Sequence, residues 1–152
     1  MSADAPSGVI TLLQEIVRIP SVSGNEADCR DHLVRWLQAK GVDARASGRN
    51  VIAVVEGRPA ADPERGLLLL THIDVVPVGA GWTREPWDGA LEQGMVFGRG
   101  SNDAKSSAAA MAWVAAHVDP DEIEGRLVVV LACDEETGGE GIEACAHELP
   151  GY

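Results

Sequence analysis

The stretch Leu67–Pro77, LLLLTHIDVVP, organises the rest of the chain. A short apolar run that ends at polar residues is typical of a buried strand, so we expect one over residues 67–70. Residues two apart in an extended chain point to the same side, which lets the Asp74 carboxylate hold one imidazole nitrogen of His72. The other nitrogen is then free to bind a metal. The alternative is a turn that merely contains a histidine and an aspartate.

The composition is that of one globular domain. The chain has 152 residues, of which 45% are hydrophobic. Its formal charge of −12, from 24 acidic and 12 basic residues, disfavours nucleic acid and anionic lipid as partners. The N-terminal MSADAPSG lacks the basic and apolar regions of a signal peptide, and no apolar run is long enough to span a membrane. We therefore expect a cytoplasmic protein with no nucleic-acid or membrane partner.

The cysteines also favour a cytoplasmic location. The three cysteines, Cys29, Cys133 and Cys145, form no C-x-x-C pair, and an odd, scattered set is typical of a reducing compartment. Cys133 lies in an apolar run and is expected to be buried. Cys145 and His147 are spaced too closely for a zinc-ligand pair, so they are interpreted as part of a helix.

Helical periodicity occurs in four parts of the chain. Ser23 followed by Glu26 has the pattern of a capping box, and so does Thr137 followed by Glu140. With the apolar spacing, these signals predict four helices. They cover residues 7–18, the segment from the first box to about Lys40, residues 104–117, and the segment from the second box to about Glu148.

Four apolar runs predict strands between these helices. The alternation predicts an α/β fold whose mostly parallel sheet is flanked by helices. In such sheets ligands bind beyond the carboxyl ends of the strands. The predicted strands cover residues 51–55, 67–70, 95–97 and 127–132.

Two further acidic groups follow predicted strands. Asp103 comes after the strand at 95–97 and before a helix, where it is either a helix N-cap or a ligand. Asp134, Glu135 and Glu136 come directly after residues 127–132. Adjacent carboxylates repel one another, and a bound divalent cation would keep them ionised. A solvated acidic turn is the alternative.

Together these residues supply the parts of a two-metal hydrolase. Such a site holds its ions ~3.5–4 Å apart, so that they activate a water and polarise the substrate carbonyl. His72 would bind one metal, Asp103 would bridge both with its two oxygens, and Glu136 would bind the second. Glu135 would take the proton from the water, and Asp74 would orient His72.

The segment between His72 and Asp103 gives weaker indications of function. Trp82 and Trp87 either line a cleft beside the site or pin the loop to the body, and both readings stay open. Gly98-Arg99-Gly100 matches neither a phosphate-binding P-loop nor a dinucleotide fingerprint. Lys105, just inside the following helix, is predicted to be structural.

The sequence resembles the metallopeptidase M20 family, which includes acetylornithine deacetylases, succinyl-diaminopimelate desuccinylases, aminoacylases and glutamate-releasing carboxypeptidases. The matching motifs are THIDVVP at 71–77, GRGSNDAK at 98–105 and DEETGG at 134–139, preceded by PSVSGNE at 20–26. Ser106 departs from the pattern, since many members have glycine there. The resemblance implies a zinc-peptidase-like catalytic domain that releases an amino acid from an N-acyl amino acid or small peptide.

The same resemblance implies the role of each site residue. It places metal ligands at His72, Asp103 and Glu136, an orienting acid at Asp74 and the general base at Glu135. Two Zn²⁺ ions are expected per complete site, and Co²⁺ or Mn²⁺ suits the same mixed histidine and carboxylate ligands.

Length is the main departure from the family. Members carry a fourth acidic ligand, a late histidine ligand and an inserted lid or dimerisation domain. Residues 1–152 are therefore expected to be the N-terminal portion of the catalytic domain, without the lid domain, and to have little activity alone. Family dimers usually form through that lid, so the resemblance allows a homodimer of the full-length protein and leaves the oligomeric state open. The alternative is a truncated or degenerate relative that binds metal weakly or serves as an interaction module.

Overall fold

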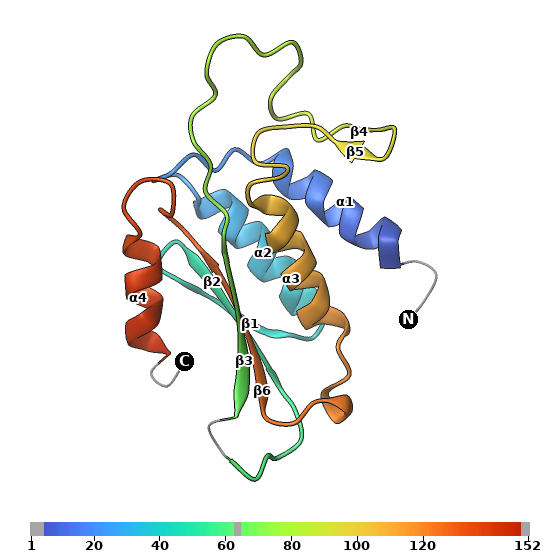
Figure 1. The fold of residues 1–152 in the computed structure, drawn as a ribbon, viewed down its shortest axis with the longest axis vertical. Helices are drawn as coiled ribbons and strands as arrows, with labels where there is room; N and C mark the ends of the chain where they lie inside the picture. The colour runs from blue at the N-terminus through green and yellow to red at the C-terminus, as the bar shows by residue number, and fades with distance from the viewer. Residues whose placement is uncertain (1–4, 63–64, 150–152) are drawn as a thin grey trace.

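The computed structural model describes residues 5–62 and 65–149 (Figure 1). Its main sheet has four strands in the order β1-β2-β6-β3, and a small hairpin pairs β4 with β5. The helices are α1 (Ala5–Val17), α2 (Ala27–Ala39), α3 (Lys105–His117) and α4 (Glu140–Glu148). The strands are β1 (Asp43–Ser47), β2 (Asn50–Glu56), β3 (Gly66–His72), β4 (Leu91–Glu92), β5 (Met95–Val96) and β6 (Arg126–Ala132).

The expected α/β fold with a sheet flanked by helices is confirmed, but the expected mostly parallel sheet is wrong. Among the strands of the described sheet, only β3 and β6 pair in parallel, while β1 with β2 and β2 with β6 are antiparallel. The reason is a strand that sequence patterning missed, since β1 (DARAS) carries few β-branched residues. It joins β2 through the short turn Gly48-Arg49, and such a turn connects only antiparallel strands.

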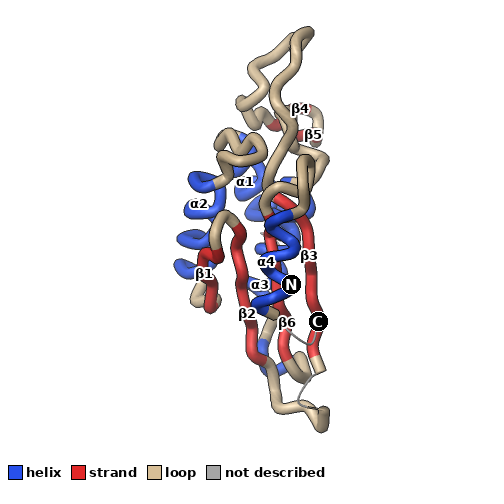
Figure 2. The backbone as a smooth tube through the Cα atoms, turned by 90° about the vertical axis from the view of Figure 1, so that its left-hand side faces the viewer, coloured by secondary structure: helices blue, strands red, loops and turns tan. Residues whose placement is uncertain are grey.

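Two layers of helices cover the sheet (Figures 1 and 2). Alternate residues of a strand face opposite sides, so β6 feeds two cores. Leu127, Val129 and Leu131 pack with α1, α2 and α3, whereas Val128 and Val130 pack with Cys145 of α4. The three-helix face carries the larger core, and β6 is the buried centre of the described sheet. None of the described helices is long and apolar enough to cross a membrane.

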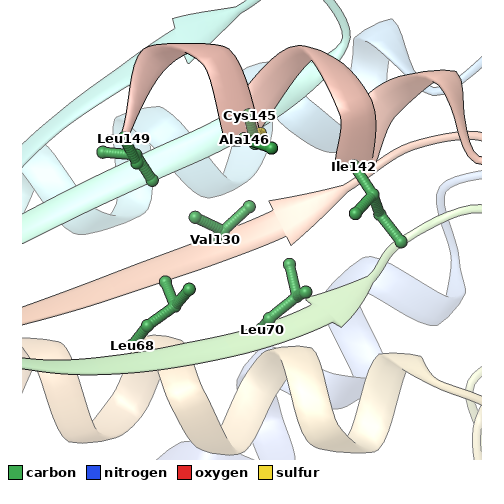
Figure 3. Close-up of a pocket in the computed structure, with 7 residues that line it drawn as sticks. All are labelled: Leu68, Leu70, Val130, Ile142, Cys145, Ala146 and Leu149. Atoms are coloured by element: carbon green, nitrogen blue, oxygen red, sulfur yellow. The ribbon is translucent and has the colours of Figure 1, made fainter. Parts of the chain in front are cut away.

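The leucine run of β3 is less buried than its sequence predicts. Leu67 is 58% exposed and Leu70 is 42% exposed, because β3 lies at the edge of the described sheet. Leu70 faces the short α4, which covers only part of that side, whereas Leu67 faces the opposite side of the sheet. Apolar composition alone does not distinguish an edge strand from a central one. An open apolar groove lies between β3 and α4 (Figure 3). It is lined by Leu68, Leu70, Val130, Ile142, Cys145, Ala146 and Leu149.

Both predicted capping boxes are wrong, although the two helices that they were predicted to begin are present. Helix α2 begins after Glu26 with no side-chain cap, and α4 begins after Gly139, which has a left-handed backbone. The Ser23 hydroxyl instead donates to Asp74 at 2.7 Å, and the Thr137 hydroxyl donates to Asp134 at 3.4 Å. Ser23 therefore donates to a distant residue and Thr137 to a residue three positions before it, so neither hydroxyl caps a helix.

The long segment after β3 rises beyond the end of the sheet before returning at β4 (Figure 1). Its tryptophans contact cations of the segment that follows β5. The Arg99 guanidinium lies 5.3 Å from the Trp82 ring centroid, and the Lys105 ammonium lies 5.7 Å from that of Trp87. These contacts favour the reading in which the tryptophans pin the loop.

Candidate metal centre

The end of β3 brings His72 and Asp74 together as the sequence predicts. His72 Nδ1 lies 3.3 Å from Asp74 Oδ1 and 3.1 Å from the Asp74 backbone oxygen. Both residues are buried, His72 at 8% exposure and Asp74 at 0%. The hydrogen bond to the Asp74 side chain raises the pKa of His72 to about 9, against the opposing effect of burial. Asp74 thus fixes the imidazole ring through Nδ1 and leaves Nε2 facing outward.

Asp74 is also the link between the two parallel strands. Its carboxylate accepts the backbone N–H groups of Glu135 and Glu136, each at 3.1 Å, and the Ser23 hydroxyl. Burial raises the pKa of Asp74, but the hydrogen bonds from His72, Ser23 and the two N–H groups lower it to about 2. The carboxylate therefore remains ionised while wholly enclosed by donors.

The free nitrogen of His72 faces two carboxylates. His72 Nε2 lies 3.3 Å from Asp103 Oδ1 and 3.8 Å from Glu135 Oε2. The Asp103 side chain is 78% exposed and that of Glu135 is 48% exposed, so the group opens to solvent. Asp103 is not the N-cap of α3, because Ala104 holds that position without a side-chain bond. Its carboxylate is therefore available to a ligand.

Glu136 joins this group by its backbone. Within the described chain, the carboxylates of Asp103 and Glu135 each lie within ion-pair distance of His72, whereas Glu136 is placed nearby by its N–H bond to Asp74. The donor set of one imidazole nitrogen and several carboxylates fits Zn²⁺, Co²⁺ or Mn²⁺. These residues are therefore suited to hold a divalent cation.

The three adjacent carboxylates do not share one environment. Asp134 is 7% exposed and turns away from Glu135 to bind the Arg49 guanidinium. Among the described residues, the ligand atoms of Glu26, Cys133 and Asp134 all lie within 4.8 Å of one another, which those of the predicted site do not. Arg49 already supplies the positive charge there, since it pairs with both carboxylates. This buried cluster is therefore an ion-pair network.

Sequence reasoning missed the polar residues that support the site. Ser23 and Glu26 lie in the PSVSGNE motif but were assigned to a cap. Arg49 lies in the tight turn between β1 and β2, where no local pattern indicates that its side chain pairs with distant carboxylates. Only the pairing of distant strands brings it to the end of β6, and sequence spacing does not reveal that.

Lys105 is structural, as predicted. Its ammonium is buried and donates to the backbone oxygens of Ile16 and Ile19, both at 2.8 Å. Burial lowers the pKa of Lys105 to about 8. The side chain ties the start of α3 to the end of α1, and so fixes the backbone that follows Asp103.

The fold is that of the metallopeptidases, as solved structures show. An M20 family metallo-carboxypeptidase from Sulfolobus solfataricus matches with a TM-score of 0.76 at 22% identity, over 97% of this chain and 34% of that one. Human carnosine dipeptidase 1 matches with a TM-score of 0.72 at 18% identity, over 95% and 35%. A dinuclear metal-binding M20 peptidase from Bacillus subtilis matches with a TM-score of 0.69 at 18% identity, over 96% and 41%.

Sequence comparison identifies the particular family: the chain belongs to peptidase family M20/M25/M40, whose model matches residues 68–151. The succinyl-diaminopimelate desuccinylase of Caulobacter sp. (strain K31) is 33% identical over 142 residues, which cover 90% of this chain and 36% of that protein. That of Cereibacter sphaeroides (strain ATCC 17029) is 37% identical over 142 residues, covering 86% and 36%. The chain therefore spans about a third of the length of these curated relatives, and the resemblance drawn from its motifs is confirmed.

Proposed function

We propose that this chain carries the metal-binding part of an amide hydrolase that releases an amino acid from an N-acyl amino acid or a small peptide. The observation that carries the proposal is the outward Nε2 of His72, with Asp103 and Glu135 within 3.8 Å of it. Family membership supports the reaction class. The relatives named as desuccinylases and dipeptidases support a small acylated or peptide substrate.

His72, Asp103 and Glu136 are the residues that would hold two zinc ions. The bound metal would polarise the amide carbonyl and favour ionisation of a water. Asp74 keeps the His72 ring oriented, because it binds Nδ1 from a fully buried position.

Glu135 is the general base in this proposal. Its carboxylate is half exposed and reaches toward the free nitrogen of His72, so it faces the space that substrate and water would enter. Glu135 takes a proton from the attacking water and passes it to the leaving amide nitrogen. Its neighbour Glu136 is assigned to the metal, so the two adjacent glutamates have different tasks in this proposal.

We further propose that residues 1–152 form the N-terminal portion of a catalytic domain, and that a lid or dimerisation domain lies outside it. The length of the relatives supports this, since the chain spans 36% of the desuccinylases. His72, Asp103 and Glu136 alone leave each ion short of protein ligands. The isolated chain should therefore bind divalent metal weakly and turn over little substrate.

Titration of Zn²⁺ into the metal-free chain, followed by calorimetry, tests the metal site. We expect weak binding that His72→Ala abolishes and that His117→Ala, a change to an exposed histidine on α3, leaves unchanged. Equal binding by the wild type and His72→Ala would contradict the assignment. Turnover of N-succinyl or N-acetyl amino acids by the isolated chain, abolished in Glu135→Ala, would contradict the proposed incompleteness.

A further inference from the structure

Two consecutive residues, Arg49 in the β1–β2 turn and Asn50 at the start of β2, contact the loop that carries Glu135 and Glu136. Asn50 is 1% exposed, and its Oδ1 accepts the backbone N–H of Cys133 at 2.8 Å. Its Nδ2 donates to the Gly141 backbone oxygen at 2.9 Å. Asn50 therefore binds the loop at the end of β6 and again at the start of α4.

Arg49 binds the same loop through a side chain. Its guanidinium contacts both oxygens of Asp134, with Nη1 3.2 Å from Oδ1. Glu26, which is fully buried, accepts from Arg49 Nη1 at 2.6 Å and from the Gly24 N–H at 2.8 Å. Because a guanidinium is planar and its donors are fixed in direction, this bracing sets the orientation of Asp134.

The loop backbone leaves little freedom between these anchors. Asp134 has a left-handed backbone with φ 59°, and its oxygen accepts the N–H groups of Gly138 at 3.0 Å and Gly139 at 2.7 Å. At Gly141 a Cβ would lie 2.3 Å from the Cys133 oxygen, so the two ends of the loop touch. Glu135 and Glu136 project from the segment that these contacts enclose.

We propose that Arg49 and Asn50 are positioning residues for Glu135 and Glu136. They hold the loop from the β1–β2 hairpin, on the side away from His72, while Asp74 holds it from β3. The inference rests on the proposed function for its metal-binding consequence, since Glu136 is a ligand and Glu135 the base only in that proposal. The geometry of the loop itself does not depend on it.

The test compares Arg49→Met and Arg49→Lys with Arg45→Met. Arg45 is the matched control, because it joins the same hairpin to α4 through an exposed ion pair with Glu148 at 2.9 Å and does not contact the loop. Arg49→Lys retains the charge beside Glu26 but lacks the planar fork, and it decides the matter if Arg49→Met does not fold. Circular dichroism establishes folding in each variant.

Two measurements are made on each variant. Amide hydrogen exchange, followed by NMR, reports whether the Glu135 and Glu136 N–H groups remain bonded to Asp74. Co²⁺ titration, followed by the visible absorption of the ion, reports the metal site. We expect at least tenfold faster exchange at both amides and about tenfold weaker Co²⁺ binding in Arg49→Met, with partial recovery in Arg49→Lys and no change in Arg45→Met.

Unchanged exchange at both amides in a folded Arg49 variant would overturn the inference. Faster exchange with unchanged Co²⁺ affinity and spectrum would overturn its metal-binding consequence. If the wild-type chain binds no Co²⁺, the proposed function fails, and the exchange rates alone decide whether Arg49 positions the loop.

Discussion

The buried carboxylate of Asp74 accepts the backbone N–H of Glu136 at 3.1 Å, across 62 positions of the sequence. Through this bond, the residue that orients His72 also fixes the acidic loop after β6. The two parallel strands therefore end in one connected group, and Asp74 is its centre.

Replacing Asp74 by asparagine should destabilise the fold. Oδ1 faces the N–H of Glu135 and Oδ2 that of Glu136, so either orientation of the amide turns an NH₂ group toward a backbone donor. A buried donor without a partner costs about 1–3 kcal/mol, and we expect the free energy of unfolding in urea to fall by that amount. Asp119→Asn is the control, since it alters an exposed carboxylate that accepts a backbone N–H at 2.9 Å. A loss at Asp74 no larger than the control's would sink this prediction.

Substitution by glutamine should distinguish the role of Glu135 from that of Glu136. In Glu136→Gln the neutral amide is a poorer metal ligand, and Co²⁺ affinity should fall about tenfold or more. In Glu135→Gln the affinity should stay within about threefold, because the base is not required to hold the ion. Co²⁺ titration of both variants side by side makes the comparison, and the reverse order would exchange the two roles.

The stability of the metal-free chain should depend on the charge of His72. The folded-state pKa of about 9 lies above the ordinary 6.5, so protonated His72 stabilises the fold below pH 6.5, and this contribution disappears as the pH rises through 9. In the presence of a chelator, the free energy of unfolding should fall by roughly 1–3 kcal/mol more in the wild type than in His72→Gln between pH 6 and 9.5. Parallel curves for the two proteins would contradict the pairing with Asp74.

The thiols should be unreactive in the folded chain. Cys29, Cys133 and Cys145 are free and at most 4% exposed, and burial raises the pKa of each, that of Cys133 to about 11. The thiolate is the reactive form, so a disulfide reagent at pH 8 should modify all three only after guanidinium is added. Rapid modification of any one of them without denaturant would show that its side chain is accessible.

Patterning predicted most elements because strand and helix periodicity is local. The runs that became β2, β6 and α3 each fall within a few residues of their predicted bounds. His72 and Asp74 were also predictable, because residues two apart in an extended chain share a side.

What patterning could not supply is the choice among distant partners. Ser23 forms a good local cap, yet Asp74 offers it a buried charged acceptor from another strand. Arg49 has no local signature, because both of its partners are distant in the sequence. Glu26 directly precedes α2, and Asp134 follows β6. The wrong prediction of a mostly parallel sheet has the same cause, because β1 can be recognised as a strand only from its pairing with β2.

The outer edge of β3 governs how the isolated chain will behave at the concentrations that spectroscopy needs. In the described sheet this strand pairs on one side, with β6. Leu70 is exposed in the apolar groove, and Leu67 is exposed on the opposite face of the strand. Such an edge is a template for strand addition by another copy, and the charge of −12 opposes that association less as salt is added. Dilute, low-salt samples are therefore the ones in which the chain should remain monomeric.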